Sequence, residues 1–151
     1  MYAAVRIRGS VNVRGDMEEA LHRMRLDRPN NCVLLLETET YLGMLRKVKD
    51  LIAYGQVDAA TVALLLRKRG RLKGGQRLTD ERVSQLGYGS LEELAKALAD
   101  GKVAFKDIPG LSPVLRLTPP SGGHKAVKRH YPEGSLGDWG SNISQLLTRM
   151  A

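Results

Sequence analysis

The sequence predicts an α/β fold of one domain with a sizeable appendage. Residues 2–8 alternate in side-chain character, which is typical of a strand with one buried face. Residues 32–36 form an apolar run between turn residues, which is typical of a buried strand. Apolar residues at helical spacing follow each of these segments. Residues 1–57 are therefore expected to form a β-α-β-α-β unit, with its helices on one face of the sheet.

The first strand and the first helix each carry a local signal. In the alternating segment, Ala3 and Val5 share one face and Arg6 lies on the other. Asp16 is followed three residues later by Glu19, which is the spacing of a capping box at a helix start. Apolar residues then recur at helical spacing as far as residue 24, and the turn residues at 28–31 end the helix.

The second helix is predicted to begin at Thr38 or Thr40, because either side chain can cap its N-terminus. Its apolar face is expected to run from Leu42 through Leu45 to Ile52. Residues 53–57 then return as a short extended segment, which supplies the third strand of the unit.

Residues 58–151 form a predicted extension that packs on the first unit. Asp58 is expected to cap a helix, and polar residues followed by acids mark two short helices that begin near residues 79 and 90. Residues 111–117 predict one added strand that could join the sheet. The apolar spacing of residues 143–150 predicts a C-terminal helix. The segments 71–77 and 118–135 are expected to be basic, Gly-rich loops.

Positive charge is concentrated in the extension. The chain has a net charge of +8. Residues 1–58 hold 9 Lys and Arg against 8 Asp and Glu, whereas the remaining residues hold 15 against 8. Such an excess suits a polyanionic partner, and the large polyanion of a cell is nucleic acid.

The clearest functional signal is the segment 118–131, Thr-Pro-Pro-Ser-Gly-Gly-His-Lys-Ala-Val-Lys-Arg-His-Tyr. No acidic residue lies between Asp107 and Glu133. A Pro-Pro-x-Gly-Gly run cannot form the interior of a helix or of a central strand, so its cations lie on an extended segment. The chain has one Phe and one Trp, too few for a base-stacking platform. Recognition of folded RNA through its shape and backbone is therefore favoured.

Three basic clusters are the candidate RNA contacts, and a solvated surface is the alternative for each. The first cluster is Arg46, Lys47 and Lys49. The second cluster is Arg67, Lys68, Arg69, Arg71, Lys73 and Arg77, with no acid between Leu64 and Leu78. The third cluster is Arg116, Gly122, Gly123, His124, Lys125, Lys128 and Arg129.

The sequence predicts no catalytic site, no metal site and no cofactor. The phosphate-loop pattern and the Gly-x-Ser-x-Gly motif are absent, and the three histidines lack the spacing of a zinc site. The single cysteine, Cys32, is expected to be buried in a protein of a reducing compartment. The apolar runs are too short to cross a bilayer and the N-terminus lacks a signal-peptide layout, so a soluble cytoplasmic protein is predicted.

Three segments resemble a known protein family. Residues 2–9, Tyr-Ala-Ala-Val-Arg-Ile-Arg-Gly, and residues 41–52, Tyr-Leu-Gly-Met-Leu-Arg-Lys-Val-Lys-Asp-Leu-Ile, resemble the core of the universal large-subunit ribosomal protein L thirty family. Residues 111–125, Leu-Ser-Pro-Val-Leu-Arg-Leu-Thr-Pro-Pro-Ser-Gly-Gly-His-Lys, resemble the hallmark of its longer archaeal and eukaryotic form, called L seven in eukaryotes. The resemblance covers essentially the whole chain and favours an archaeal source.

The resemblance implies a ferredoxin-like α/β core and a structural role, as a monomer, in the large ribosomal subunit. It also implies binding to large-subunit ribosomal RNA near the 5S RNA, with neighbouring ribosomal proteins as further partners. The first cluster matches the core motif, and Gly122 through Lys125 match the extension motif. Ser121 stands where the family commonly has Arg, which removes one potential phosphate contact, and Ala126 stands where Gly is frequent.

Three classes of function compete. The leading hypothesis is a ribosomal structural protein that binds folded ribosomal RNA. The alternative is a free-standing regulator that binds structured RNA with the same fold. An enzyme acting on nucleotides is a third class, and the missing phosphate loop argues against it.

Overall fold

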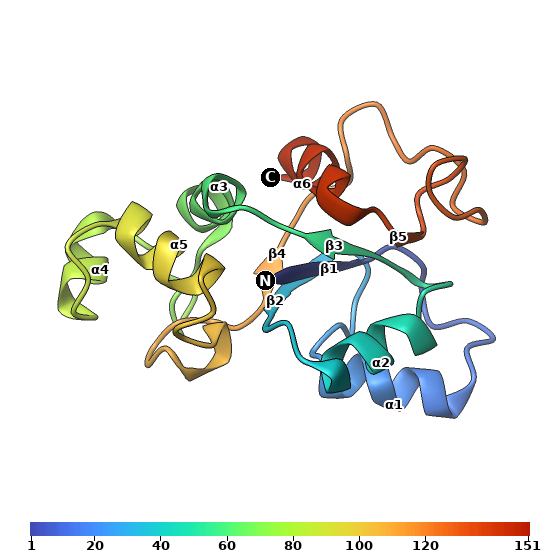
Figure 1. Cartoon of the computed structure of the whole chain (residues 1–151), viewed down its shortest axis with the longest axis horizontal. Helices are drawn as coiled ribbons and strands as arrows, with labels where there is room; N and C mark the ends of the chain where they lie inside the picture. The colour runs from blue at the N-terminus through green and yellow to red at the C-terminus, as the bar shows by residue number, and fades with distance from the viewer.

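The computed structural model describes residues 1–151 as helices packed on one five-stranded sheet with the strand order β4-β2-β1-β3-β5 (Figure 1). The central strand β1 (Tyr2–Arg6) is antiparallel to both β2 (Asn31–Leu35) and β3 (Ile52–Gln56). The extension supplies both outer strands. Strand β4 (Leu115–Arg116) is antiparallel to β2, and β5 (Gly137–Asp138) is parallel to β3. The predicted α/β class with a ferredoxin-like core is confirmed.

Helices cover both faces of the sheet. They are α1 (Gly15–Arg23), α2 (Glu39–Lys47), α3 (Ala59–Arg69), α4 (Asp80–Gln85), α5 (Leu91–Ala99) and α6 (Ile143–Met150), with short 3-10 turns η1 (Phe105–Asp107) and η2 (Gly140–Asn142). Helices α1 and α2 lie together on one side of the sheet (Figure 1). On the other side α3 and α6 pack against the sheet, while α5 packs on α3 and α4 on α5. The expectation that the two helices of residues 1–57 share one face is confirmed, and the extension covers the second face. None of these helices has the length and apolar character that a membrane crossing requires.

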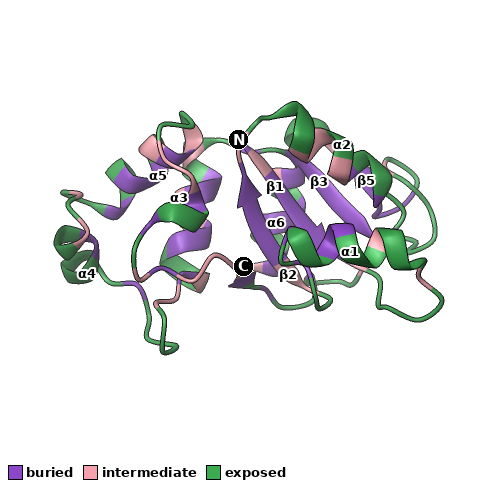
Figure 2. Ribbon diagram, turned by 90° about the horizontal axis from the view of Figure 1, so that it is seen from below, coloured by how far each residue is buried: buried purple, intermediate pink, exposed green.

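Strand β1 is buried on both of its faces, not on one as its alternation predicted (Figure 2). Ala3 and Val5 pack in the cluster that includes α3, α5 and α6, whereas Ala4 packs against α1 and α2. All three side chains are fully buried. A central strand between two helical layers has no solvent-facing side, so residues on both of its faces belong to the core.

Arg6 is the largest exception to the apolar composition of this core, with 1% of its surface exposed. Its guanidinium donates hydrogen bonds to the carbonyl oxygens of Leu26 and Asp27, both at 2.8 Å, and to Ser10 Oγ and Arg8 O, both at 2.9 Å. Burial lowers its pKa from the ordinary value, although nearby Glu18 and Asp27 oppose the change. Arg6 thus joins the β1–α1 loop to the turn that follows α1.

The two helix starts of the first unit differ in how well the sequence predicted them. The capping box of Asp16 was wrong, because α1 begins at Gly15 and its N-cap residue, Arg14, makes no side-chain cap hydrogen bond. Thr38 does cap α2, and its hydroxyl accepts a hydrogen bond from the Tyr41 N–H at 3.3 Å. Helix α2 ends at Lys47, so the prediction that its apolar face reaches residue 52 was also wrong.

The extension begins as predicted, because the Asp58 carboxylate caps α3 by accepting the Thr61 N–H at 3.1 Å. The expected strand at 111–117 is shorter, since only two of its residues form β4. Strand β5 was not expected at all. It is followed by η2, which packs so closely on β3 that a Cβ at Gly55 would collide with the carbonyl oxygen of Gly140. A glycine on β3 is what allows this approach.

Candidate nucleic-acid interface

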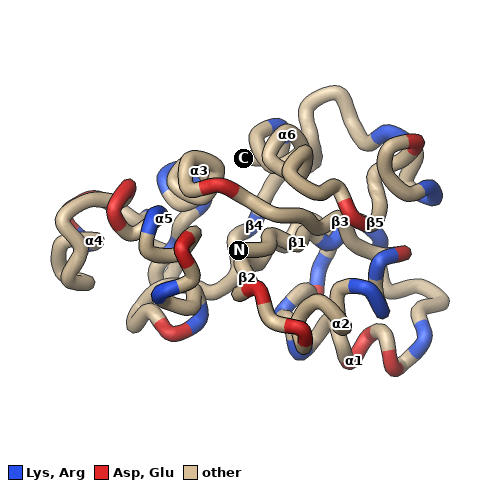
Figure 3. The backbone as a smooth tube through the Cα atoms, viewed as in Figure 1, with Lys and Arg blue, Asp and Glu red and all other residues tan.

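Lys and Arg occur on several faces of the molecule, not in one patch (Figure 3). The structure therefore decides which of the predicted basic residues lie together. It divides the second cluster between two surfaces and joins part of it to Arg116 of the third cluster.

One groove gathers cations from three elements. Arg69 comes from the end of α3, Arg71 and Lys73 from the turn that follows, and Arg116 from β4. We call this the basic groove. Its volume is about 590 Å³, and none of its 10 lining residues is acidic. Cations gathered in this way repel one another, and a bound phosphate group relieves that repulsion.

The basic groove is built on an ordered turn, not on the irregular loop that the sequence predicted for residues 71–77. Arg71 pairs with Arg77 as an antiparallel bridge, and the Leu72 N–H donates to Gln76 O at 2.8 Å. The turn is closed by Gly74 and Gly75, whose φ angles are +96° and +83°, a region that glycine enters without strain. Leu72 also forms an antiparallel bridge with Leu111, which fixes the turn against the segment that leads to β4.

The cations of the basic groove have no carboxylate partner. The Arg69 guanidinium donates to Thr118 Oγ1 at 3.1 Å, and that of Arg71 donates to Gly75 O at 3.5 Å. Both acceptors are neutral. The positive charge of the groove is thus not compensated within the protein.

The other members of the second cluster lie elsewhere. Arg67 and Lys68 face a hollow between α3 and α5, where Arg67 lies 3.8 Å from Glu92 in an exposed ion pair. Arg77 pairs with Arg71 through its backbone, but it does not line the basic groove. The sequence run of six cations is therefore not a single surface.

The first cluster lies on the opposite side of the sheet from α3. Arg46 and Lys47 belong to the last turn of α2, and Lys49 follows it. All three are exposed. Lys47 lies 3.5 Å from Asp16, so one of the three cations is partly compensated by a carboxylate of α1.

After Arg116 on β4, the third cluster continues on a segment that is held by the C-terminal helix. The Arg149 guanidinium donates to Ser121 O at 2.6 and 3.0 Å and to Gly123 O at 2.8 Å. Gly122 and Gly123 have φ angles of +78° and +74°, and the Gly123 N–H closes a turn by donating to Pro120 O at 2.8 Å. Sequence reasoning missed Arg149, because an isolated cation at the end of an amphipathic helix gives no signal of this role.

The rest of this segment folds back on itself instead of remaining open. The Ser135 N–H donates to Ala126 O and the Leu136 N–H to Arg129 O, both at 3.1 Å. His130 Nε2 lies 2.8 Å from Asp50 Oδ1, which ties the segment to the turn before β3. The side chains of Lys125, Lys128 and Arg129 stay exposed, as a phosphate contact requires.

His124 differs from its neighbours in being half-buried. Its Nδ1 atom is buried and has no hydrogen-bond partner. Burial lowers its pKa, and the positive charge of Arg149 lowers it further. His124 is therefore a weaker candidate for a charged phosphate contact than Lys125.

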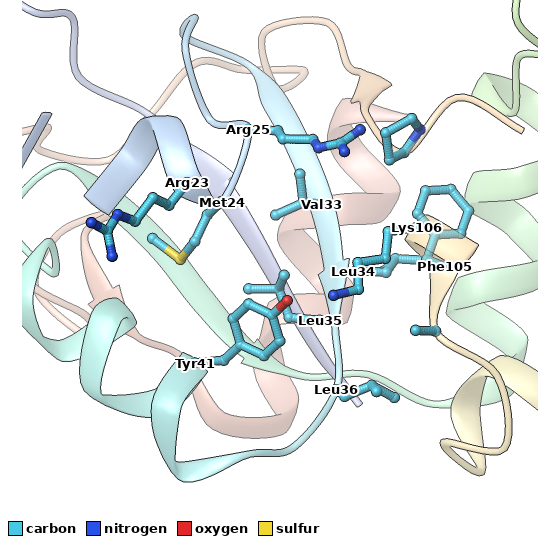
Figure 4. Close-up of a pocket in the computed structure, with 12 residues that line it drawn as sticks. Arg23, Met24, Arg25, Val33, Leu34, Leu35, Leu36, Tyr41, Phe105 and Lys106 are labelled. Carbon is cyan, nitrogen blue, oxygen red and sulfur yellow. The ribbon is translucent and has the colours of Figure 1, made fainter. Parts of the chain in front are cut away.

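A small hollow lies at the outer edge of β2, where β4 pairs only with Asn31 and Cys32. Figure 4 shows Met24 and Tyr41 on one side of β2 and Phe105 and Lys106 on the other. Its volume of about 70 Å³ is far below the ~300–1,000 Å³ of typical ligand sites. Nowhere in the chain do three or more His, Cys, Asp or Glu side chains lie together in a way that could hold a metal ion.

Comparison with known proteins identifies the family. A family model described as "Ribosomal protein L30p/L7e" matches residues 2–52. The chain is 52% identical over 152 residues to the "Large ribosomal subunit protein uL30" of Methanocorpusculum labreanum and 50% identical over 151 residues to that of Archaeoglobus fulgidus. It is 45% identical over 152 residues to the protein of the same name from Methanocella arvoryzae. Each alignment covers 99% of both chains. The chain therefore belongs to the ribosomal protein L30p/L7e family.

Proposed function

We propose that this chain is a structural constituent of the large ribosomal subunit and binds folded large-subunit ribosomal RNA, with the basic groove as its principal contact. The observation that carries the proposal is the convergence of Arg69, Arg71, Lys73 and Arg116 in a groove without a carboxylate. The relatives that match 99% of the chain are named as large-ribosomal-subunit proteins, and this supports the large subunit as the assembly that the chain joins.

The geometry of the basic groove suits an RNA backbone. Phosphate contacts supply a large share of the affinity of proteins for nucleic acids, and Arg and Lys make most of them. The glycines of the turn leave its tip without side chains, so a phosphate can approach the backbone closely. Folded RNA also presents 2′-hydroxyl groups, which the hydroxyl of Ser112 in the same groove can contact.

The other two clusters are proposed as further RNA contacts. The first cluster and the basic groove lie on opposite sides of the sheet. Lys125, Lys128 and Arg129 of the third cluster lie on the loop that follows the turn held by Arg149. One flat RNA surface cannot reach both sides, so the protein is proposed to sit between separate RNA segments. Proximity to the 5S RNA and contacts with neighbouring ribosomal proteins belong to the same proposal. The division into a core of residues 1–57 and an extension of residues 58–151 also remains a proposal.

Sedimentation of the tagged, full-length protein in its own cells tests the assignment. A constituent of the large subunit travels with large subunits through a gradient and stays with them after a moderate-salt wash. A free-standing regulator of structured RNA, the alternative function, leaves the subunit fraction in that wash. Cross-linking on the purified subunits then identifies the RNA segments that are contacted, including any in the 5S RNA.

A further inference from the structure

A second groove lies where β1 ends and β3 begins. It is lined by the β1–α1 loop, the turn before β3 and Val127 of the loop before β5. The two exposed large apolar side chains of the molecule both line it, with Val11 85% exposed and Val127 44% exposed. We call it the valine groove. Its volume of about 520 Å³ lies within the ~300–1,000 Å³ of typical ligand sites.

The three segments around the valine groove are tied to one another. The Ile7 and Arg8 N–H groups both donate to Leu51 O at 3.0 Å, and the Arg8 guanidinium donates to Asp50 O at 3.3 Å. The 2.8 Å contact of His130 Nε2 with Asp50 Oδ1 holds the segment of Val127 to the same turn. The three segments that line the valine groove are therefore held in place relative to one another.

The charge around the groove limits what can occupy it. Arg8 and Arg14 line it, and the one lining acid, Asp50, is paired with His130. Two further exposed cations, Lys128 and Arg129, follow Val127 directly in the sequence. Arg14 lies 3.3 Å from Asp16 and Arg129 lies 3.5 Å from Glu133, both in exposed pairs, so Arg8 and Lys128 are the cations here without a carboxylate partner. Apolar walls beside such cations match a group that joins an uncharged, flat part to a negative one. A nucleotide has this combination in its base and its phosphate.

We propose that the valine groove holds one unpaired nucleotide of the bound ribosomal RNA. The base lies against Val11 and Val127, and its phosphate faces Arg8 and Arg14. This inference rests on the proposed function, since the nucleotide belongs to the RNA that the protein binds. Sequence-specific RNA recognition commonly uses unstacked bases, and here two valines take the place of the scarce aromatic side chains.

Replacing both valines by serine tests the contact with the base without changing the contacts with phosphates. The Val11→Ser plus Val127→Ser variant is expected to bind a large-subunit ribosomal RNA transcript roughly tenfold more weakly, because apolar contact area is lost. The slope of log affinity against log salt stays unchanged, because no charge is removed. An unchanged affinity, or a changed slope, would overturn the proposal. Both side chains are exposed, so the melting temperature of the free variant serves as the control for folding.

A photo-reactive side chain identifies the occupant directly. The variant Val11→benzoylphenylalanine, assembled into large subunits and irradiated, is expected to cross-link to one ribosomal RNA nucleotide. The same substitution at Ala60, exposed on α3, serves as the control and must not label that nucleotide. Cross-linking of position 11 to a neighbouring protein would overturn the inference and leave the proposed function intact. Failure of the unmodified protein to join large subunits would instead contradict the proposed function itself.

Discussion

His130 Nε2 lies 2.8 Å from Asp50 Oδ1, and this pair joins the loop before β5 to the turn before β3. Both side chains are about half exposed, at 48% and 53%. A contact between two side chains this exposed contributes about 0–1 kcal/mol to the free energy of unfolding. Its main effect is to hold the loop that carries Val127, Lys128 and Arg129 in a fixed position relative to the core.

Asp50→Ala is expected to loosen this loop without unfolding the protein. Amide exchange at Tyr131, Ser135 and Leu136 becomes faster, because the hydrogen bonds of those N–H groups depend on the folded loop. The free energy of unfolding changes by less than about 1 kcal/mol. Glu133→Ala, which removes only the exposed pair with Arg129, is the matched control. Equal exchange rates in wild type and Asp50→Ala would show that the pair does not hold the loop.

Arg6→Ala is expected to destabilise the protein by about 2–4 kcal/mol in urea unfolding. The substitution leaves the buried carbonyl oxygen of Leu26 and the partly buried one of Asp27 without their donor and opens a cavity at the end of β1. Arg8→Ala provides the control, because Arg8 is an exposed arginine of the same loop with a single 3.3 Å side-chain bond. A loss below about 1 kcal/mol at position 6 would mean that water replaces the guanidinium at little cost.

Cys32 is expected to resist thiol reagents until the protein unfolds. Complete burial raises the pKa of its thiol to about 12, so almost no thiolate is present at pH 8. Labelling at that pH should be at least about a hundredfold slower than in denaturant. The folded state keeps a proton that the unfolded chain loses near pH 9, so this group makes stability fall as the pH rises above that value. Fast labelling of the native protein would contradict the placement of β2 in the core.

Gly122→Ala plus Gly123→Ala is expected to lower stability by roughly 1–2 kcal/mol per position, because both residues have positive φ angles. The added methyl groups meet no backbone atom within 4 Å, so conformational strain is the cause and not a clash. Gly43→Ala is the opposite control. Gly43 lies in α2 with open space around it, and alanine there should stabilise by about 1 kcal/mol. Equal melting temperatures for the double variant and wild type would contradict the turn geometry.

Local patterns in the sequence predicted the three main strands and most helix starts, because alternation and capping act over a few residues. The burial of Arg6 was not predictable in this way, since the carbonyl groups that surround it come from the turn after α1. Strand β5 gave no signal either, because Gly137 and Asp138 both have weak strand propensity and pair only through tertiary contact with β3.

The candidate site shows the same limit. The runs of basic residues in the sequence predicted that Lys and Arg form the candidate site. They also predicted that Arg67 and Arg69 belong to one surface. The structure places these two on different sides of α3 and brings Arg69 to Arg116, which lies far away in the sequence. Neighbouring positions on a helix point in different directions, and only the fold decides which distant segment each one meets.

The salt dependence of RNA binding tests the central claim most directly. Affinity for a large-subunit ribosomal RNA transcript is measured across salt concentrations for wild type and for Arg71→Gln plus Arg116→Gln. The matched control is Arg23→Gln plus Lys102→Gln, two cations outside the basic groove that pair with Glu19 and Asp100. If the groove binds phosphates, the groove variant loses about one unit of log–log slope for each contact, and the control keeps the wild-type slope. Equal slopes for the two variants would contradict the assignment of the basic groove as the RNA contact.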